Sequence, residues 1–204
     1  MSTENDSHRA EMKRIKSIQD ARVRSKTIRR GVLIVNTGDG KGKSTAAFGM
    51  AIRAAGHGQR VGLVQFIKGK WRTGEQAALK RFPEIEHIIS GEGFTWNTQD
   101  KERDIAAAQV GWQQAVRIIE ASRGESPAYD LLILDELNIA LRYEQLPLDE
   151  VVAVLSNIPR ELSVVVTGRD AKPELIDIAD TVTEMACVKH AFASGIRARK
   201  GVDF

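Results

Sequence analysis

The sequence predicts an α/β protein in which a mostly parallel central sheet is flanked by helices on both faces. Three observations carry this prediction: apolar runs of strand length, segments of helical periodicity between them, and a glycine-rich turn after the first run. Strands buried on both faces have continuous apolar sequences, and strands that alternate with helices are typical of parallel sheets. We therefore expect the loops after the strands to share one edge of the sheet, where ligands of such folds bind.

The expected elements alternate along the chain. Continuous apolar or β-branched runs predict strands over 31–37, 60–68, 130–135, 163–167 and 181–188. Apolar residues at helical spacing predict helices over 43–55, 100–122, 148–157 and 173–179. In the long helix this spacing places Trp112 on the face that is expected to be buried.

Composition restricts the class of protein. A chain of 204 residues with 42% hydrophobic and 28% charged residues is long enough for one well-buried domain. Its longest apolar runs are far below the roughly 20 residues that span a bilayer, and its first residues are polar and charged, unlike a signal peptide. Cys187 is the only cysteine, which excludes an intramolecular disulfide framework. We expect a soluble, cytoplasmic protein.

Positive charge is concentrated near the N-terminus. Residues 9–30 hold nine Lys and Arg against Glu11 and Asp20, a local charge of +7, whereas the whole chain has a net charge of +3. We therefore divide the chain into a basic arm over 1–28, partly helical or disordered, and an α/β domain over 29–204. The arm is either a solvated tail or a segment that docks on something anionic, such as nucleic acid or a bound nucleotide.

The strongest local signal is the segment Thr37-Gly38-Asp39-Gly40-Lys41-Gly42-Lys43-Ser44-Thr45, between the first strand and the first helix. It closely matches the phosphate-binding P-loop, G-x-x-x-x-G-K-[ST], with Thr37 in the position of the first glycine. Such a loop directs backbone N–H groups at phosphate oxygens, and the following helix adds its positive N-terminal dipole. We expect Lys43 to contribute a charge and Ser44 to ligate Mg²⁺. Lys41 is either a second phosphate contact or simply exposed.

A P-loop predicts an acidic group at the end of another strand. Asp135 and Glu136 follow the apolar run 131–134, and a carboxylate there can lie opposite Ser44 and hold the metal directly or through water. The alternative is a helix cap or a surface acid. Arg169 follows the strand over 163–167, so it is predicted at the same edge as a phosphate contact.

These parts leave the reaction open. Hydrolases and kinases attack the γ-phosphorus, and they need a positioned water or hydroxyl, often with a general base and an arginine. Glu136 can orient water and Arg169 can act within the same chain. The motif therefore predicts a nucleotide site without choosing the reaction.

Further segments, taken together with the P-loop, carry a more specific resemblance. They are Val64-Gln-Phe-Ile-Lys-Gly69, Gly93-Phe-Thr-Trp-Asn-Thr-Gln99, Leu134-Asp-Glu-Leu137, Val166-Thr-Gly-Arg169 and Val188-Lys-His-Ala-Phe192. From about Gly31 to Phe204 the chain resembles the P-loop type of ATP:corrinoid adenosyltransferase, whose fold is similar to that of RecA-like P-loop NTPases. Thr37 is also the family's form, whereas Asn97 and Asn138 stand where Glu and Thr are expected.

The resemblance implies group transfer instead of phosphate cleavage. In such enzymes a Co(I) corrinoid attacks the 5′-carbon of the ATP ribose and inorganic triphosphate leaves, in adenosylcobalamin biosynthesis and salvage. ATP and the corrinoid (cobalamin or a precursor) are then substrates, with Mg²⁺ or Mn²⁺ as the metal. Lys43 is implied to be catalytic because it stabilises the charge that grows on the leaving group. Co(I) is already a strong nucleophile and needs no general base.

Two aromatic residues gain a role only through the resemblance. Phe94 and Trp96 are implied to bind the corrinoid and to displace its lower axial ligand, which makes Co(II) easier to reduce. Without the resemblance, two aromatics two residues apart are expected to pack one face of a strand on the core. The family also implies a homodimer and a reduced flavodoxin-type electron donor.

A second class of function remains as an alternative. A RecA-like ATPase that acts on nucleic acid would use the basic arm to follow phosphates, and its binding would depend steeply on salt. The resemblance favours the transferase, and with it no nucleic-acid or membrane partner.

Overall fold

The computed structural model describes residues 2–67, 73–90 and 100–203, and the chain divides into two compact units, Met1–Arg30 and Gly31–Phe204. The first unit contains α1 (Ser2–Arg24), a helix whose apolar residues Met12, Ile15 and Ile18 are exposed within the unit. An ion pair between Arg14 and Glu11, 3.0 Å long, joins neighbouring turns of this helix. No described helix is both long and apolar enough to cross a membrane.

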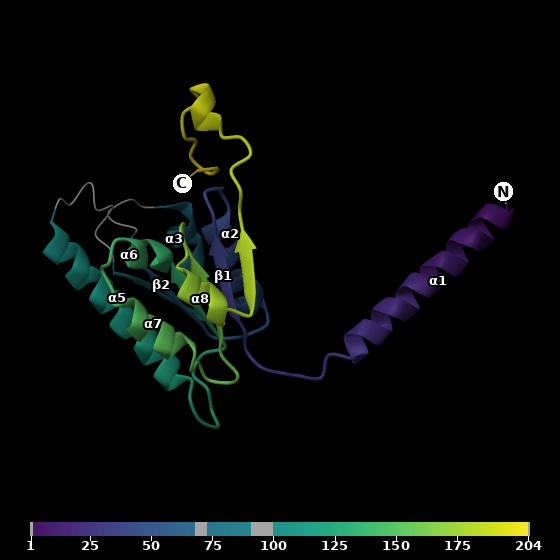
Figure 1. Cartoon of the computed structure of the whole chain (residues 1–204), viewed down its shortest axis with the longest axis horizontal. Helices are drawn as coiled ribbons and strands as arrows, with labels where there is room; N and C mark the ends of the chain where they lie inside the picture. The colour runs from purple at the N-terminus through teal and green to yellow at the C-terminus, as the bar shows by residue number, and fades with distance from the viewer. Residues whose placement is uncertain (1, 68–72, 91–99, 204) are drawn as a thin grey trace. The chain divides into compact units, whose positions relative to one another are not determined.

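The second unit is built on one parallel sheet (Figure 1). Its strands lie in the order β3-β2-β4-β5-β1-β6, and every neighbouring pair is parallel. In chain order they are β1 (Leu33–Thr37), β2 (Val61–Gln65), β3 (Ile85–Ile89), β4 (Leu131–Asp135), β5 (Ser163–Thr167) and β6 (Thr181–Glu184). The predicted α/β class with a parallel sheet is confirmed, and it is consistent with a P-loop NTPase-like fold.

Helices cover both faces of this sheet (Figure 1). The described helices are α2 (Lys43–Gly56), α3 (Gly74–Leu79), α5 (Lys101–Ala121), α6 (Leu137–Arg142), α7 (Leu148–Leu155) and α8 (Pro173–Ile178), followed by the 3-10 turn η1 (Ala191–Ser194). Helix α2 packs on one face, and α5, α7 and α8 pack on the other. The four central strands β2, β4, β5 and β1 are therefore largely buried on both sides, as their continuous apolar sequences require, whereas the edge strands β3 and β6 are partly or fully exposed.

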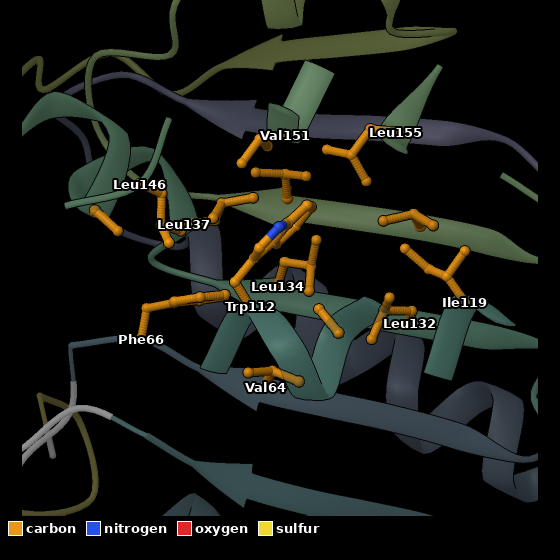
Figure 2. Packing of buried hydrophobic residues seen from close by; sticks show 14 of the residues in the cluster. Val64, Phe66, Trp112, Ile119, Leu132, Leu134, Leu137, Leu146, Val151 and Leu155 are labelled. Carbon is orange, nitrogen blue, oxygen red and sulfur yellow. The ribbon is translucent and has the colours of Figure 1, made fainter. Parts of the chain in front are cut away.

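Alternate residues of the strands enter two separate cores. Leu132 and Leu134 of β4 face the larger core under α5 and α7, whereas Ile133 faces the smaller core under α2. In Figure 2 the indole of Trp112 lies in the larger core near Leu134. Its Nε1 donates to Oε1 of Glu150 at 2.9 Å, so the one polar atom of this ring is satisfied. The predicted burial of Trp112 is confirmed.

Several elements differ from the sequence expectation. Strand β3 and helices α3 and α6 are not among the predicted elements, and β2 and β6 end before residues 68 and 188. β3 was missed because its sequence mixes Glu86 and His87 with isoleucine, as suits a half-buried edge strand. β6 ends early because the chain turns toward the P-loop, where the Met185 carbonyl accepts the Gly40 N–H at 2.6 Å.

Candidate active site

The P-loop connects β1 to α2, as predicted, and its glycines are required by its shape. Gly38 and Gly42 have φ values of 91° and 114°, a left-handed region that disfavours residues with a side chain. A Cβ atom on Gly38 or Gly40 would lie 2.6 Å from the Met185 carbonyl oxygen. The loop therefore combines a tight turn with close packing against the chain that follows β6.

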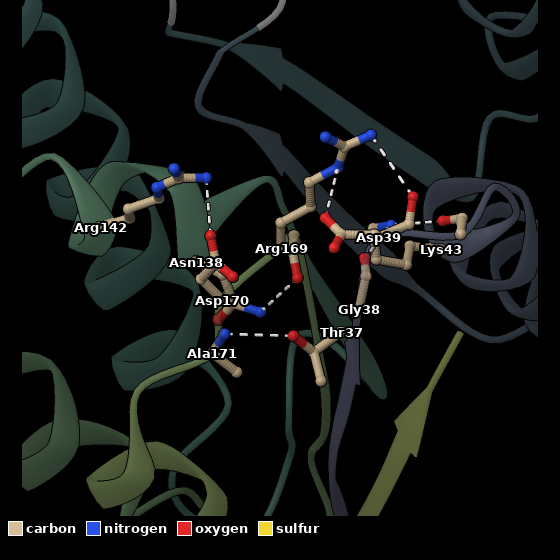
Figure 3. Close-up of polar contacts among 11 residues, drawn as sticks. Thr37, Gly38, Asp39, Lys43, Asn138, Arg142, Arg169, Asp170 and Ala171 are labelled. Atoms are coloured by element: carbon tan, nitrogen blue, oxygen red, sulfur yellow. Dashed lines mark hydrogen bonds and ion pairs between the residues drawn. The ribbon is translucent and has the colours of Figure 1, made fainter. Parts of the chain in front are cut away.

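Thr37 ties the start of the P-loop to another strand end (Figure 3). Its side-chain Oγ1 accepts the backbone N–H of Ala171 at 3.1 Å. Glycine in this position has no such oxygen. The departure from the general motif thus adds a contact between the P-loop and the segment after β5.

Lys43 lies inside the loop that it completes. Its side chain is buried, and Nζ donates to the carbonyl oxygens of Gly38 and Gly40, both at 2.6 Å. Burial lowers the pKa of Lys43, and the nearby charge of Arg169 lowers it further, while Glu136 and Asp39 act in the opposite direction. A bound polyphosphate would add negative charge next to this ammonium and favour its protonated form.

A cavity of about 570 Å³ opens above the P-loop. Its floor is formed by residues 39–45, and its walls come from α3, α6, the ends of β4 and β5, and the C-terminal segment. The lining outside the P-loop consists of Ile67, Glu75, Glu136, Ile139, Arg142, Tyr143, Arg169, Val202 and Asp203. Both charged and apolar side chains are present, as expected of a site that binds an organic anion.

The two acidic residues at the end of β4, Asp135 as its last residue and Glu136 directly after it, have different surroundings. Glu136 lines the cavity together with Ser44, so these two predicted metal-binding residues share one space. Asp135 is buried, and its two carboxylate oxygens accept hydrogen bonds from Gln65 Nε2 and Thr167 Oγ1, both at 2.8 Å. Asp135 is not one of the described residues that line the cavity.

Two cations that the sequence analysis named as candidate phosphate contacts, Arg169 and Lys41, line the cavity. Arg169 contacts the P-loop: its Nε is 3.7 Å from Asp39 Oδ1, and its Nη2 donates to the Asp39 carbonyl at 3.4 Å (Figure 3). Lys41 is half exposed and forms an ion pair with Asp203 near the C-terminus.

The sequence interpretation did not select several residues of the site. Glu75, Arg142 and Tyr143 line the cavity, and Thr167 joins the ends of β4 and β5. The available signal for Thr167 was its place as the last residue of a buried strand, beside the strand that ends in Asp135. Phe94 and Trp96 lie outside the described residues, so their predicted position at the corrinoid stays a prediction.

The parallel sheet, the glycine-rich loop after β1 and the acidic end of β4 define a P-loop nucleotide-binding protein. The model of the family "ATP:corrinoid adenosyltransferase BtuR/CobO/CobP" matches residues 29–204, and the chain belongs to this family. It is a transferase that uses ATP and a corrinoid, as the resemblance implied. The alternative of an ATPase acting on nucleic acid has no support from these matches.

Several curated relatives match over nearly their whole length. A corrinoid adenosyltransferase of Pseudomonas aeruginosa is 52% identical over 198 residues, which cover 97% of this chain and 95% of the relative. A corrinoid adenosyltransferase of Escherichia coli K12 is 46% identical over 191 residues, 94% of each chain. The corrinoid adenosyltransferase CobA of Salmonella typhimurium is 44% identical over 191 residues, which also cover 94% of each chain.

Proposed function

We propose that this chain transfers the 5′-deoxyadenosyl group of ATP to the Co(I) centre of a corrinoid and that its P-loop holds the departing triphosphate. The observation that carries the proposal is the buried ammonium of Lys43 inside the loop, at the floor of the cavity. Family membership decides which bond breaks, and the P-loop geometry supports where the charge of the leaving group is stabilised.

The transfer needs no proton acceptor. Co(I) contributes an electron pair to form the cobalt–carbon bond, and the bond between C5′ and the triphosphate oxygen breaks with its pair on the oxygen. Negative charge therefore grows on the triphosphate as it leaves. In this proposal Lys43 and the N-terminal dipole of α2 stabilise this charge, and stabilisation that increases in the transition state accelerates the step.

The residues present fit a magnesium or manganese ion. Ser44 and Glu136 bring a hydroxyl and a carboxylate to the same cavity, and such hard oxygen donors are the ligands that these cations prefer. When bound, the ion adds positive charge beside the triphosphate. In this proposal Asp135 contributes from behind the cavity, through its hydrogen bond with Thr167.

The remaining cations complete the proposed nucleotide site. Arg169 is held against Asp39 of the P-loop, which places its guanidinium at the edge of the cavity. Lys41 also lines the cavity, and it pairs with the carboxylate of Asp203, as Arg169 pairs with that of Asp39. We assign both cations to the phosphates of ATP, together with the backbone of residues 37–45.

Other parts of the proposal come from the family resemblance. We propose that Phe94 and Trp96 contact the corrinoid, that a reduced flavodoxin-type protein supplies the electron, and that two copies of the chain form a homodimer. We place the enzyme in the cytoplasm, where such a reductant is available.

Product analysis with labelled ATP tests the central proposal. Incubation with Mg²⁺ and a chemically reduced corrinoid should yield triphosphate and adenosylcorrinoid in equal amounts, and omission of the corrinoid should stop triphosphate release. Formation of ADP and phosphate as the main products would contradict the proposal. If nucleic acid stimulated that hydrolysis, the alternative function would be supported.

A further inference from the structure

A row of hydrogen bonds crosses four neighbouring strands, from His87 in the middle of β3 to the last residues of β2, β4 and β5. His87 Nε2 lies 2.7 Å from Gln65 Oε1, and Gln65 Nε2 donates to Asp135 Oδ2 at 2.8 Å. On the other side, Thr167 Oγ1 donates to Asp135 Oδ1 at 2.8 Å. Gln65, Asp135 and Thr167 are at most 1% exposed, so these bonds are protected from water. The row gives the Asp135 carboxylate a fixed orientation.

Thr167 extends this row to Glu136. The backbone N–H of Glu136 donates to Thr167 Oγ1 at 3.0 Å, while the same hydroxyl donates its proton to Asp135. One hydroxyl has one proton and two lone pairs, so it can make both bonds at once. Glu136 has a φ of 65°, an unfavourable value for a residue with a side chain, and it persists only where neighbouring contacts hold it.

The neighbouring glycine makes room for the Glu136 side chain. Gly168 has a φ of 130°, and a Cβ atom there would lie 3.3 Å from Glu136 Oε2 and 2.8 Å from Asn138 Cβ. The carboxylate of Glu136 therefore lies against the backbone at the end of β5. Two consecutive residues of β5 and its loop thus set the conformation of Glu136, one through its hydroxyl and one through its missing side chain.

We infer that Thr167 is a positioning residue for Glu136: its hydroxyl transmits the fixed orientation of buried Asp135 to the backbone of Glu136 and so holds the carboxylate ready for the metal ion of the nucleotide site. The inference rests on the proposed role of Glu136 at that ion. It assigns separate roles to the two acidic residues at the end of β4, with Glu136 at the ion and Asp135 behind it.

A metal-binding measurement without corrinoid tests this inference. Mn²⁺ is titrated into the full chain with ATP, and protein-bound Mn²⁺ is counted by electron paramagnetic resonance. Thr167→Val removes the hydroxyl at nearly constant volume and should weaken Mn²⁺ binding about tenfold, as for other groups that orient metal ligands. Thr167→Ser keeps the hydroxyl and should stay within about twofold of the unchanged protein.

The control variant makes the same chemical change elsewhere. Thr181 lies exposed at the start of β6, so Thr181→Val should leave Mn²⁺ binding unchanged. A purely structural role of Thr167 would lower the melting temperature of Thr167→Val and leave Mn²⁺ binding to the folded protein unaltered, and that result overturns the inference. If Thr167→Val does not fold, Thr167→Cys replaces it, because its thiol is a weak donor and acceptor. Mn²⁺ binding by that variant as tight as by Thr167→Ser also overturns the inference.

Glu136→Gln separates this inference from the function on which it rests. Weakened Mn²⁺ binding in both Glu136→Gln and Thr167→Val supports both ideas. Weakened binding in Glu136→Gln alone rejects the positioning role and leaves the proposed metal site intact. Unchanged binding in Glu136→Gln rejects the proposed metal site, and the role of Thr167 with it.

Discussion

The two walls of the cavity above the P-loop are held in different ways. The wall at the ends of β4 and β5 is fixed by buried hydrogen bonds that involve Asp135 and Thr167. The wall formed by the C-terminal segment contributes Val202 and Asp203, and an ion pair between Asp203 and half-exposed Lys41 links it to the P-loop. Hydrogen bonds to a buried charge contribute more than an exposed ion pair, which water and salt screen.

This difference suits the two walls to different roles in the site. A group that must meet a metal ion or a leaving group benefits from a fixed position, because no reorganisation is then needed during the reaction. In the proposed site Lys41 binds a phosphate of ATP, so the carboxylate that now pairs with it must instead be easy to displace. The Lys41 ammonium and the Arg199 backbone N–H lower the pKa of Asp203, so its carboxylate is ionised at neutral pH. In the proposed site this carboxylate would compete with the phosphates of ATP for Lys41.

The largest expected effect on turnover comes from Lys43, in the P-loop that forms the floor of the cavity between the two walls. Lys43→Ala removes the buried ammonium, and turnover should fall at least 100-fold because the growing charge of the triphosphate loses its cation. Triphosphate release with chemically reduced corrinoid measures this effect. Lys41→Ala is the matched control, and its loss should be much smaller because that side chain is half exposed. A near-normal rate for Lys43→Ala would refute the leaving-group role.

Replacing Gly168 by alanine is expected to destabilise the wall of the cavity at the ends of β4 and β5. Gly168→Ala forces a side chain into a left-handed position and brings Cβ within 2.8 Å of Asn138 Cβ. The free energy of unfolding should fall by about 3 kcal/mol, the combined scale of local overpacking and backbone strain. Urea denaturation measures the change. Gly124→Ala also replaces a glycine with positive φ, but its Cβ would meet open space, so its smaller loss isolates the steric part.

The lowered pKa of Lys43 predicts how ATP binding depends on pH. Protonated Lys43 attracts the triphosphate, so the affinity for ATP should fall as the pH rises through the pKa of the free protein. Because burial lowers this pKa, the fall should begin at a lower pH than for an ordinary lysine. Calorimetric titration with ATP between pH 7 and 10.5 checks the direction. Lys43→Arg should remove this dependence, because arginine stays charged throughout.

The smallest expected effect comes from the wall that the C-terminal segment forms, which contains Asp203. Asp203→Asn removes the negative charge that pairs with Lys41, so the KM for ATP should fall about threefold at low salt, with little change at high salt. Steady-state kinetics at two ionic strengths measure the difference. Glu161→Gln, a change of the same kind at an exposed residue outside the described cavity, is the control. A marked rise of the KM would show that Asp203 helps to hold the nucleotide, and the contrast between the walls would fail.

Local sequence signals were enough for the strand, loop and helix that carry the phosphate site. Thr37 to Thr45 form one continuous motif, and β1 and α2 on either side have strong apolar patterns, so short-range chemistry predicts this part. The same signals predicted acids at the end of β4 and an arginine after β5. They did not distinguish Asp135 from Glu136, because the two residues are adjacent and equally acidic.

The sequence by itself therefore determined the α/β class, the parallel sheet, the P-loop and, through its longer resemblance, the family. The tertiary structure alone decided that Asp135 is enclosed between Gln65 and Thr167, that Glu136 faces the cavity, and that Asp203 reaches Lys41, 162 positions earlier. The physical reason is the range of the interactions. Strand and loop patterns are set by neighbours along the chain, whereas these hydrogen bonds and ion pairs depend on strand order and on where distant segments meet.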